Sequence, residues 1–130
     1  MTPAKWYRPL VPRSLVWVAV EADRPVGFAC TEPFEDALHL WELAVRLDVQ
    51  RRGVGRALVI AVAADARARS LPAVTLTTFR DIPWNGPFYG RLGFVEIPHA
   101  EASARLAGLC VQEAALGLDV ANRCVMRLAV

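Results

Sequence analysis

The turn at residues 50–57, Gln-Arg-Arg-Gly-Val-Gly-Arg-Ala, constrains the fold of this chain more than any other stretch. It separates a β-rich apolar run that ends near Leu47 from a stretch of helical periodicity that begins at Gly53. The first turn of a helix has free N–H groups and the positive end of the helix dipole, so it attracts anions. Glycines let the backbone approach an anion without a Cβ in the way. The turn therefore predicts a strand–turn–helix unit that binds a small anionic ligand.

Hydrophobic periodicity and turn residues predict the elements on either side of this turn. Upstream, we expect a hairpin of strands at 15–20 and 26–31, turning around residues 23–25, and then a strand at 38–47. Downstream, we expect a helix at 53–70, a strand at 73–79, a short helix at 87–92 and a strand at 94–97. A long helix from His99 or Ala100 to Leu116 and a strand at 123–130 complete the pattern.

Three leading antiparallel strands followed by βαβ units predict an α/β fold, with a mixed, mostly antiparallel central sheet flanked by helices. Residues 1–14 contain three prolines and alternate poorly, so we expect an irregular N-terminal arm there. Residues 15–130 are expected to form a single domain, which is a usual domain length.

Composition excludes several classes of protein. The 130 residues are 55% hydrophobic and 22% charged, which excludes a disordered tail or a coiled coil. A net charge of +2 is too small to predict a nucleic-acid surface. The longest apolar runs are shorter than the roughly 18 residues of a membrane span, and the N-terminus does not resemble a secretory signal. Three widely spaced cysteines without a CxxC pair predict no metal site and a reducing, cytoplasmic location.

The glycine turn differs from two common phosphate-binding motifs. A P-loop requires Lys and then Ser or Thr after its second glycine, whereas Arg56 and Ala57 follow Gly55. The dinucleotide fingerprint requires a third glycine where Leu58 stands. A tight strand-to-helix turn with a solvated basic face is the alternative interpretation of the turn on its own.

A second motif lies about 35 residues downstream, where residues 88–94 read Phe-Tyr-Gly-Arg-Leu-Gly-Phe. Together with the Gln-x-x-Gly-x-Gly turn that starts at Gln50, it resembles the GCN5-related N-acetyltransferase (GNAT) family. That resemblance implies that the turn holds the pyrophosphate of acetyl-CoA and that Tyr89 lies near the thioester sulfur. It covers residues 15–95 and extends to the closing helix and strand.

The chain departs from the family pattern in two places. Family members begin with a strand and one or two helices that help to wall the acceptor pocket, and residues 1–14 are too short to supply them. An open acceptor side or a partner that fills the gap is therefore expected. Many members also place a CoA-contacting Asn seven residues before the tyrosine, where this chain has Ile82. Asn85 stands only four residues before Tyr89, and Pro87 is expected to open the short helix.

Acetyl-CoA is the implied co-substrate, and no metal is implied. The pantetheine arm is implied to pair with the backbone of the strand before the turn. The residues implied to hold acetyl-CoA are Leu43, Ala44, Val45, Gln50, Arg51, Arg52, Gly53, Val54, Gly55, Arg56, Ala57 and Tyr89.

Acetyl transfer to an amine requires a base, because an alkylammonium group loses its proton only near pH about 10 in water. The candidates are Glu42 and His39, with neither as an open alternative. Their positions differ in parity, so a regular strand would send them to opposite faces, unless it carries the bulge that family members have. Tyr89 is the candidate acid for the leaving thiolate. Thr77 stands where some members hold an acid, and it cannot act as that base. Trp41 and Trp84 are candidates for lining an acceptor pocket.

The resemblance implies direct acetyl transfer from acetyl-CoA to a primary amine on a small molecule or a peptide. The alternatives are a non-catalytic acyl-CoA-binding sensor or regulatory module, and a structural partner. An exposed β-rich edge at residues 15–20 also predicts a homodimer. Neither nucleic acid nor a membrane is expected as a partner.

Overall fold

A computed structural model of the protein describes residues 4–7, 15–118 and 121–130. The chain divides into two units: residues 1–74 with Val130, called here the N-terminal unit, and residues 75–129, the C-terminal unit. Strand β5 (Ala73–Phe79) begins in the first unit and continues in the second.

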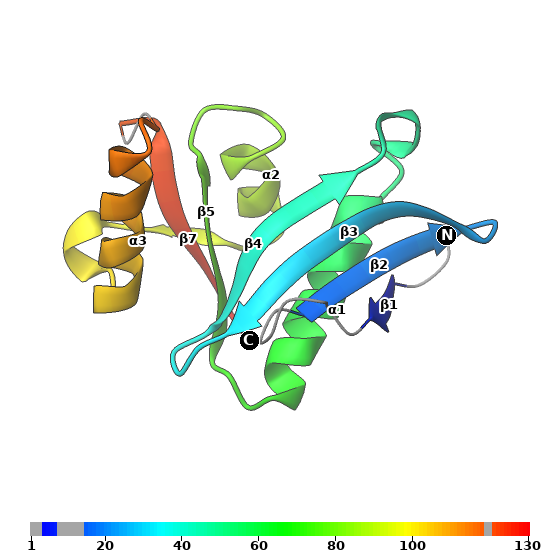
Figure 1. The fold of residues 1–130 in the computed structure, drawn as a ribbon, viewed down its shortest axis with the longest axis horizontal. Helices are drawn as coiled ribbons and strands as arrows, with labels where there is room; N and C mark the ends of the chain where they lie inside the picture. The colour runs from blue at the N-terminus through cyan, green and yellow to red at the C-terminus, as the bar shows by residue number, and fades with distance from the viewer. Residues whose placement is uncertain (1–3, 8–14, 119–120) are drawn as a thin grey trace. The chain divides into compact units, whose positions relative to one another are not determined.

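Antiparallel strands dominate the N-terminal unit. Its described residues form a run of neighbouring strands in the order β1 (Ala4–Tyr7), β2 (Leu15–Glu21), β3 (Arg24–Pro33) and β4 (Leu38–Val45). Each pairs antiparallel with the next, so the expected hairpin and third strand are confirmed (Figure 1). The 3-10 helix η1 (Leu47–Val49) and helix α1 (Val54–Ala68) follow β4.

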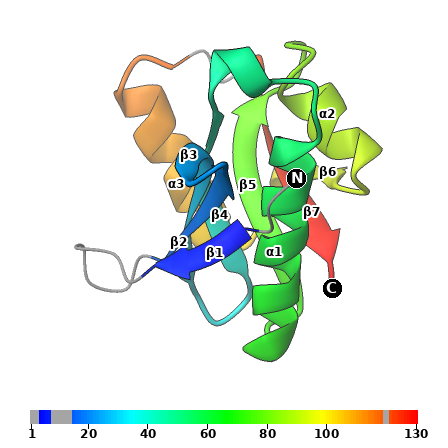
Figure 2. The ribbon, with the colours of Figure 1, turned by 90° about the vertical axis from the view of Figure 1, so that its right-hand side faces the viewer.

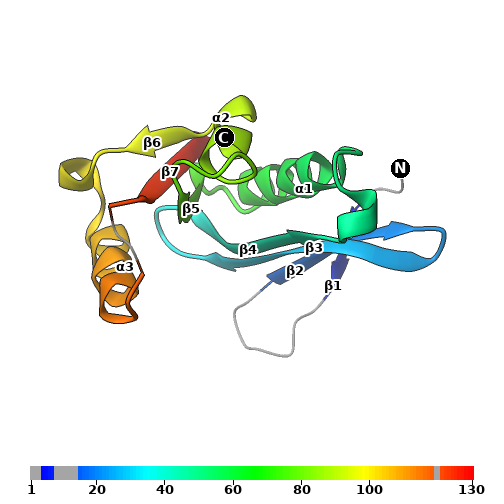
Figure 3. The same cartoon turned by 90° about the horizontal axis from the view of Figure 1, so that it is seen from above.

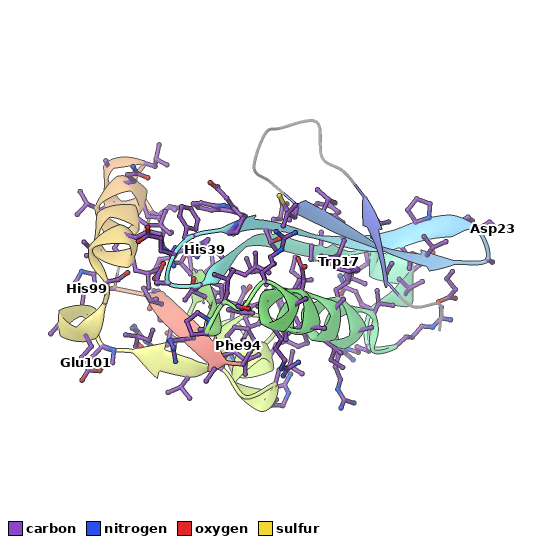
Figure 4. All side chains as sticks on the ribbon, turned by 90° about the horizontal axis from the view of Figure 1, so that it is seen from below. Trp17, Asp23, His39, Phe94, His99 and Glu101 are labelled. Carbon is purple, nitrogen blue, oxygen red and sulfur yellow. The ribbon has the colours of Figure 1, made fainter. Side chains whose placement is uncertain are left out.

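The β2–β3 hairpin turns one residue earlier than the sequence predicts. Glu21 pairs with Arg24, which leaves Ala22 and Asp23 as the turn. Both have positive φ, 51° and 62°, as a two-residue turn with the right-handed twist of its strands requires. Asp23 therefore lies at the tip of the hairpin (Figure 4).

The expectation of an irregular arm over residues 1–14 is wrong for residues 4–7, which form β1. This strand pairs with β2 over Ala4–Tyr7, opposite residues 16–19. Pairing with β2 gives the backbone N–H and C=O groups of residues 4–7 hydrogen-bond partners other than water. So short a strand can pair in this way without alternating apolar and polar side chains, which is the pattern that indicates a strand in a sequence. The edge of β2 is therefore covered at these residues. Residues 1–3 and 8–14 of the expected arm lie outside the described residues.

Helix α1 covers one face of the N-terminal strands (Figure 3). Its buried side chains are Val54, Leu58, Val59, Val62, Ala63 and Ala66. The expected helix is confirmed, and Ala64 within it is exposed. A Cβ placed on Gly27 would lie 3.3 Å from the side chains of both Val54 and Leu58. Gly27 thus faces α1 and lets the helix approach β3 closely.

The C-terminal unit continues from β5 through α2 (Gly86–Arg91), β6 (Val95–Ile97), the 3-10 helix η2 (His99–Glu101), α3 (Ala104–Ala115) and β7 (Arg123–Ala129). Its strands lie in the order β5-β7-β6, and β6 pairs antiparallel with β7. Helix α2 lies beside β6 and β7 (Figure 2). From β2 onward, the order of strands and α-helices agrees with the sequence prediction.

The expected long helix near 99–116 is divided into η2 and α3. Ala102 and Ser103 between them have extended backbones, with ψ of 140° and 162°. The Ser103 side chain accepts a hydrogen bond from the Leu106 N–H at 3.3 Å. A serine at an N-cap competes with the continuous helix by satisfying a free N–H itself, so α3 begins at Ala104.

Candidate functional site

The glycine turn presents the open N-terminus of α1. Gly53 is the N-cap residue, with φ of 83°, and no side chain caps the helix. The first bond of the helix runs from the Ala57 N–H to the Gly53 carbonyl at 3.0 Å. The N–H groups of Val54, Gly55 and Arg56 precede that bond, so the helix itself supplies no carbonyl for them. The turn is thus built as the sequence predicts, with its donors at the positive end of a 15-residue helix.

The arginines around this turn are of two kinds. Arg46 pairs with Asp48 at 3.1 Å, and Arg52 pairs with Glu21 at 2.6 Å. Arg51 and Arg56 are exposed, and neither forms an ion pair within the part of the chain that the structure describes. Arg51 also has a left-handed backbone, with φ of 66°. Arg51 and Arg56 are therefore the cations that remain available to an anion at this turn.

The end of β4 has backbone groups directed to both sides. The Arg46 N–H donates to the Val26 carbonyl of β3 at 2.8 Å. Since hydrogen-bonding direction alternates along an antiparallel strand, Ala44 also faces β3, whereas Leu43 and Val45 direct their N–H and C=O away from it. The Gln50 side chain donates to the Val45 carbonyl at 3.2 Å. Gln50 thereby ties the turn to the end of β4.

Strand β4 contains a bulge at Trp41 that corrects the expectation from parity. Cys30 pairs with Glu42 and Thr31 pairs with Leu40, so Trp41 is the extra residue. The extra residue shifts the alternation by one, which places Glu42 on the face of the strand that carries His39 and Trp41. Gly27, three positions before Cys30, faces α1, so this face is the one turned away from α1.

The three side chains on this face differ in exposure. His39 is 1% exposed, and its ring lies 4.5 Å from the Trp41 ring and 6.4 Å from Phe34, in edge-on contacts. Trp41 is 46% exposed and donates from Nε1 to Glu32 Oε1 at 3.1 Å. Glu42 is exposed. The accessible base candidate is therefore Glu42, while His39 packs beneath Trp41.

The carboxylates of this face affect the pKa of the Cys30 thiol. Burial raises the pKa of Cys30, and the negative charges of Glu42 and Glu32 raise it further. The effect of both charges on one thiol agrees with the shared face that the bulge creates. Cys30 is half-buried, as a small apolar side chain would be, and no group in the described part of the chain lowers its pKa.

Tyr89 lies in α2 of the C-terminal unit. Its side chain is 8% exposed, and its ring contacts Phe88 and Phe94 edge-on, at 5.1 and 5.4 Å between centroids. Burial raises the pKa of Tyr89 to about 12, so the phenol is neutral at pH 7. Among the described residues, we find no hydrogen-bond partner for its hydroxyl. A rigidly held O–H with unused donor capacity fits the predicted acid.

The residues before α2 form a turn, as the Pro-Trp-Asn-Gly-Pro sequence suggests. The Asn85 N–H donates to the Ile82 carbonyl at 2.9 Å, and Asn85 is the N-cap residue of α2 without a side-chain cap. Trp84 is 74% exposed, so it is not a core residue.

Sequence reasoning missed a polar cluster in the C-terminal unit. Thr77 donates to Glu113 Oε2 at 2.6 Å, and Arg123 pairs with Glu113 Oε1 at 3.0 Å. Glu113 is 7% exposed in a helix that otherwise buries Leu106, seven positions earlier. A lone acid on the buried stripe of an amphipathic helix was the signal available in the sequence.

Across the described residues, no group of three or more His, Cys, Asp or Glu side chains is arranged to hold a metal ion. The same residues include no helix long and apolar enough to cross a membrane.

Comparison with known proteins assigns the family. A family model described as an acetyltransferase (GNAT) domain matches residues 12–96, more than half of the chain. The chain therefore belongs to the GNAT family of acetyltransferases.

Solved structures show the same fold. A protein assigned as a streptothricin acetyltransferase from Bacillus anthracis, bound to acetyl coenzyme A, matches with a TM-score of 0.71 and 16% identity over 93% of this chain and 65% of its own. The PaiA N-acetyltransferase of Thermoplasma acidophilum, in complex with coenzyme A, matches with a TM-score of 0.69 and 13% identity over 91% of this chain and 62% of its own. The Escherichia coli ribosomal-protein-S18-alanine N-acetyltransferase matches with a TM-score of 0.68 and 21% identity over 92% of this chain and 71% of its own.

These likenesses establish a GNAT-like α/β fold, with a mixed sheet flanked by helices, as the sequence predicts. The chain spans 65% and 62% of the length of the first two of these proteins.

Proposed function

We propose that this protein is an acetyl-CoA-dependent N-acetyltransferase that transfers the acetyl group directly to a primary amine. The observation that carries the proposal is the open N-terminus of α1 behind Gly53, with Arg51 and Arg56 exposed beside it. Backbone donors, a helix dipole and available cations are what a pyrophosphate requires. Proteins of the same fold are crystallised with acetyl coenzyme A or coenzyme A, which supports this choice of anion.

The residues of the turn fit the phosphates and the pantetheine arm separately. The N–H groups of Val54, Gly55 and Arg56 would bind the pyrophosphate, with Arg51 adding charge. The backbone N–H and C=O groups of Leu43 and Val45 that point away from β3 would pair with the amides of the pantetheine arm. The Val45 carbonyl already accepts one hydrogen bond from the Gln50 side chain. Bound acetyl-CoA supplies an activated acyl group, and the rest of the chemistry falls to the chain's own side chains.

The acceptor amine is proposed to bind on the face of β4 that carries Trp41 and Glu42. Glu42 and Glu32 give this face negative charge, and Trp41 gives it an exposed aromatic surface. An ammonium group is attracted to both kinds of surface. Glu42 is proposed to take the amine proton, directly or through one water, before the amine attacks the acyl carbon. His39 is proposed to hold Trp41 in place through their edge-on contact.

Tyr89 is proposed to donate its phenolic proton to the sulfur of the leaving thiolate. The neutral phenol at pH 7 supports that role, because a donor must keep its proton until the thiolate forms.

The proposal also concerns the location of the protein and its oligomeric state. Three free cysteines among the described residues support a reducing, cytoplasmic location. A homodimer stays a prediction, but the β1 pairing removes the open β2 edge that motivated it. Sedimentation velocity at tens of micromolar protein would decide the oligomeric state.

Calorimetric titration with acetyl-CoA tests the binding half of the proposal. We expect the Arg51→Ala/Arg56→Ala double variant to bind at least tenfold more weakly, a loss of about 1.4 kcal/mol or more. Arg67→Ala is the matched control, because Arg67 is exposed at the other end of α1. This control should bind within about twofold of the unaltered protein. Equal affinities for the double variant and the control would contradict the site.

Thiol release from acetyl-CoA with a panel of primary amines tests the catalytic half. Release that depends on both protein and amine supports the transferase. Tight acetyl-CoA binding without release for any amine would instead favour the non-catalytic acyl-CoA-binding module, which needs the turn but no base.

A further inference from the structure

A cavity of about 240 Å³ lies within the C-terminal unit, between residues of β5, β6, α3 and β7. Its charged lining consists of two arginines and two glutamates: Arg80, Arg123, Glu96 and Glu113. The rest of the wall includes the Thr77 hydroxyl, the Cys110 and Cys124 thiols, the His99 ring and apolar side chains of β6 and β7. None of these residues belongs to the glycine turn or to the face of β4 described above.

The inner side of the cavity is a nearly buried ion pair. The side chains of Arg123 and Glu113 are 17% and 9% exposed, and Arg123 Nε lies 3.0 Å from Glu113 Oε1. Thr77 links the two, since it donates to Glu113 Oε2 at 2.6 Å and accepts from Arg123 Nη2 at 3.0 Å. The Phe79 ring lies against the Arg123 guanidinium, 4.7 Å from its centre. Both charges are therefore held in fixed positions.

The second ion pair, Arg80 with Glu96, also lines the cavity. Arg80 Nη2 lies 2.6 Å from Glu96 Oε1, and Arg80 also donates to the carbonyls of Ala121 and Arg123 at 2.6 and 3.3 Å. About two-fifths of each side chain is exposed, so this pair borders the cavity near solvent. Arg80 has few donors left for a ligand.

The Arg123–Glu113 pair keeps unused hydrogen-bond donors on Arg123 and unused acceptor sites on Glu113. A guanidinium has five N–H donors, and Arg123 uses Nε and one N–H of Nη2 in the bonds above, so Nη1 has no partner among the described residues. A carboxylate accepts at about four sites, and Glu113 uses two. Partly satisfied groups that border a cavity are places where a ligand gains hydrogen bonds at little cost in desolvation.

We propose that this cavity binds a small zwitterion, and specifically a free α-amino acid. Its carboxylate would accept from Arg123 Nη1, and its ammonium group would donate to Glu113. The two glutamates and two arginines of the wall balance, so a ligand without net charge leaves that balance intact. The opposite charges of Glu113 and Arg123 are adjacent, as the two charged groups of an α-amino acid are. The volume lies below the roughly 300–1,000 Å³ of pockets for drug-sized ligands, which favours a molecule of this size.

The proposal goes beyond acetyl transfer and does not depend on it, because binding here needs none of the residues assigned to acetyl-CoA or to the base. The ligand has two chemical sources: an amino acid that also serves as the acceptor on the face of β4, and an amino acid that acts only as an effector. The recognition chemistry is the same for both.

Cys110 offers a direct readout of occupancy, because it lines the cavity and is half-buried. The Cys30→Ser variant removes the other half-buried thiol, and Cys124 is buried. We would measure the alkylation rate of Cys110 by iodoacetamide at pH 8.5, alone and with 10 mM L-alanine, L-serine, L-leucine or L-glutamine. Propionate and ethylamine at the same concentration test each charged group alone.

At least one of the four amino acids should slow Cys110 alkylation fivefold or more, while propionate and ethylamine should not. The Arg123→Lys variant should lose this protection, since the single ammonium nitrogen of a lysine cannot replace donors that the guanidinium places on three separate nitrogens. Arg127→Lys on the same strand lies outside the lining and should keep it. Calorimetric titration of the unaltered protein with the protecting amino acid gives a second measurement that needs no variant.

Equal alkylation rates with and without all four amino acids, and no heat of binding, would overturn the proposal. Protection by propionate alone to the same degree would overturn the zwitterion. Mass spectrometry after incubation with acetyl-CoA then separates the sources. An acetylated amino acid identifies the acceptor, and an unmodified amino acid that still protects Cys110 identifies an effector. Either result retains the site, whatever the outcome of the acetyl-CoA titration.

Discussion

The buried phenol of Tyr89 has a consequence for stability as well as for the proposed proton transfer. Burial raises its pKa to about 12, whereas a phenol in the unfolded chain titrates near about 10. The folded state therefore holds the proton more tightly than the unfolded state. The stability that this difference contributes is complete below pH 10 and decreases as the pH rises toward 12. We expect the loss to reach about 1.4 kcal/mol at pH 11.

Urea unfolding of the unaltered protein and of Tyr89→Phe at pH 9 and pH 11 measures this effect. Phenylalanine keeps the ring contacts with Phe88 and Phe94 and removes the titration. The difference in unfolding free energy between the two proteins should shift by about 1.4 kcal/mol in favour of the variant on going to pH 11. A constant difference would show that the phenol is not desolvated in the folded state.

The same substitution tests the proton donor. An alkyl thiolate is a fair leaving group, with a thiol pKa near about 8.5, so the need for an acid is modest. Tyr89→Phe should lower kcat by ten- to a few hundredfold, toward the low end of the roughly 10²–10⁴ that positioned acids contribute. KM for acetyl-CoA should change little, because the hydroxyl acts in the transition state. An unchanged kcat, where chemistry limits the rate, would reduce Tyr89 to a packing residue.

Glu42→Gln tests the proposed base. The amide cannot take a proton, so kcat/KM for the amine should decrease by about 10² or more at pH 7. The deficit should shrink as the pH approaches about 10, because solution then supplies more of the free amine. Glu35→Gln, an exposed acid in the turn before β4, is the matched control and should leave the rate unchanged. Equal effects of the two variants would exclude Glu42 as the base.

The residue scale also shows where sequence reasoning reached its limit. Counting positions places His39 and Glu42 on opposite faces, and the structure places them on one face because Trp41 is an extra residue in the pairing. Whether a strand carries a bulge depends on its partner strand, so a count along one strand could only name the possibility. The turn at Gly53 was predictable because its donors and glycines are consecutive in the sequence.

At the scale of elements, the contact between β3 and α1 depends on Gly27. A Cβ there would lie 2.8 Å from the Ala44 carbonyl oxygen, a backbone atom that cannot move aside easily. Gly27→Ala should therefore destabilise the protein by about 1–3 kcal/mol, the usual cost of overpacking. Because Ala44 lies in the strand proposed to bind pantetheine, the affinity for acetyl-CoA should decrease as well.

Gly108→Ala in α3 is the control for Gly27→Ala. An added Cβ meets no atom within 4 Å there, and alanine is the better helix former by about 0.5–1 kcal/mol. Urea unfolding should show opposite signs for the two variants. Similar unfolding free energies for both would contradict the close approach of α1 to β3.

Elements formed by interactions between residues close in the sequence could be predicted, whereas elements that depend on distant residues could not. Helix α1 and strand β5 follow from local periodicity and from Pro72 between them, and β5 has the predicted bounds. Strand β1 forms through pairing with β2, and residues 4–7 carry no pattern of their own that indicates it. The Thr77–Glu113 bond joins residues 36 positions apart, so the cluster around the cavity emerges only from the folded chain.

At the scale of the whole molecule, the sequence predicts one domain over residues 15–130, and thermal unfolding tests this. We expect a single transition in calorimetry, with calorimetric and van't Hoff enthalpies that agree.

Acetyl-CoA at about 100 times its Kd should add about 2.7 kcal/mol to the unfolding free energy, which corresponds to roughly 10 °C in Tm for a chain of this size. Pantetheine, which lacks the phosphates, should raise Tm far less, because the Gly53 turn then binds no anion. If the glycine turn and Tyr89 belong to one cooperative structure, the whole transition shifts together. Two transitions, of which acetyl-CoA moves only one, would show that residues 1–74 and 75–129 unfold independently, contrary to the single domain.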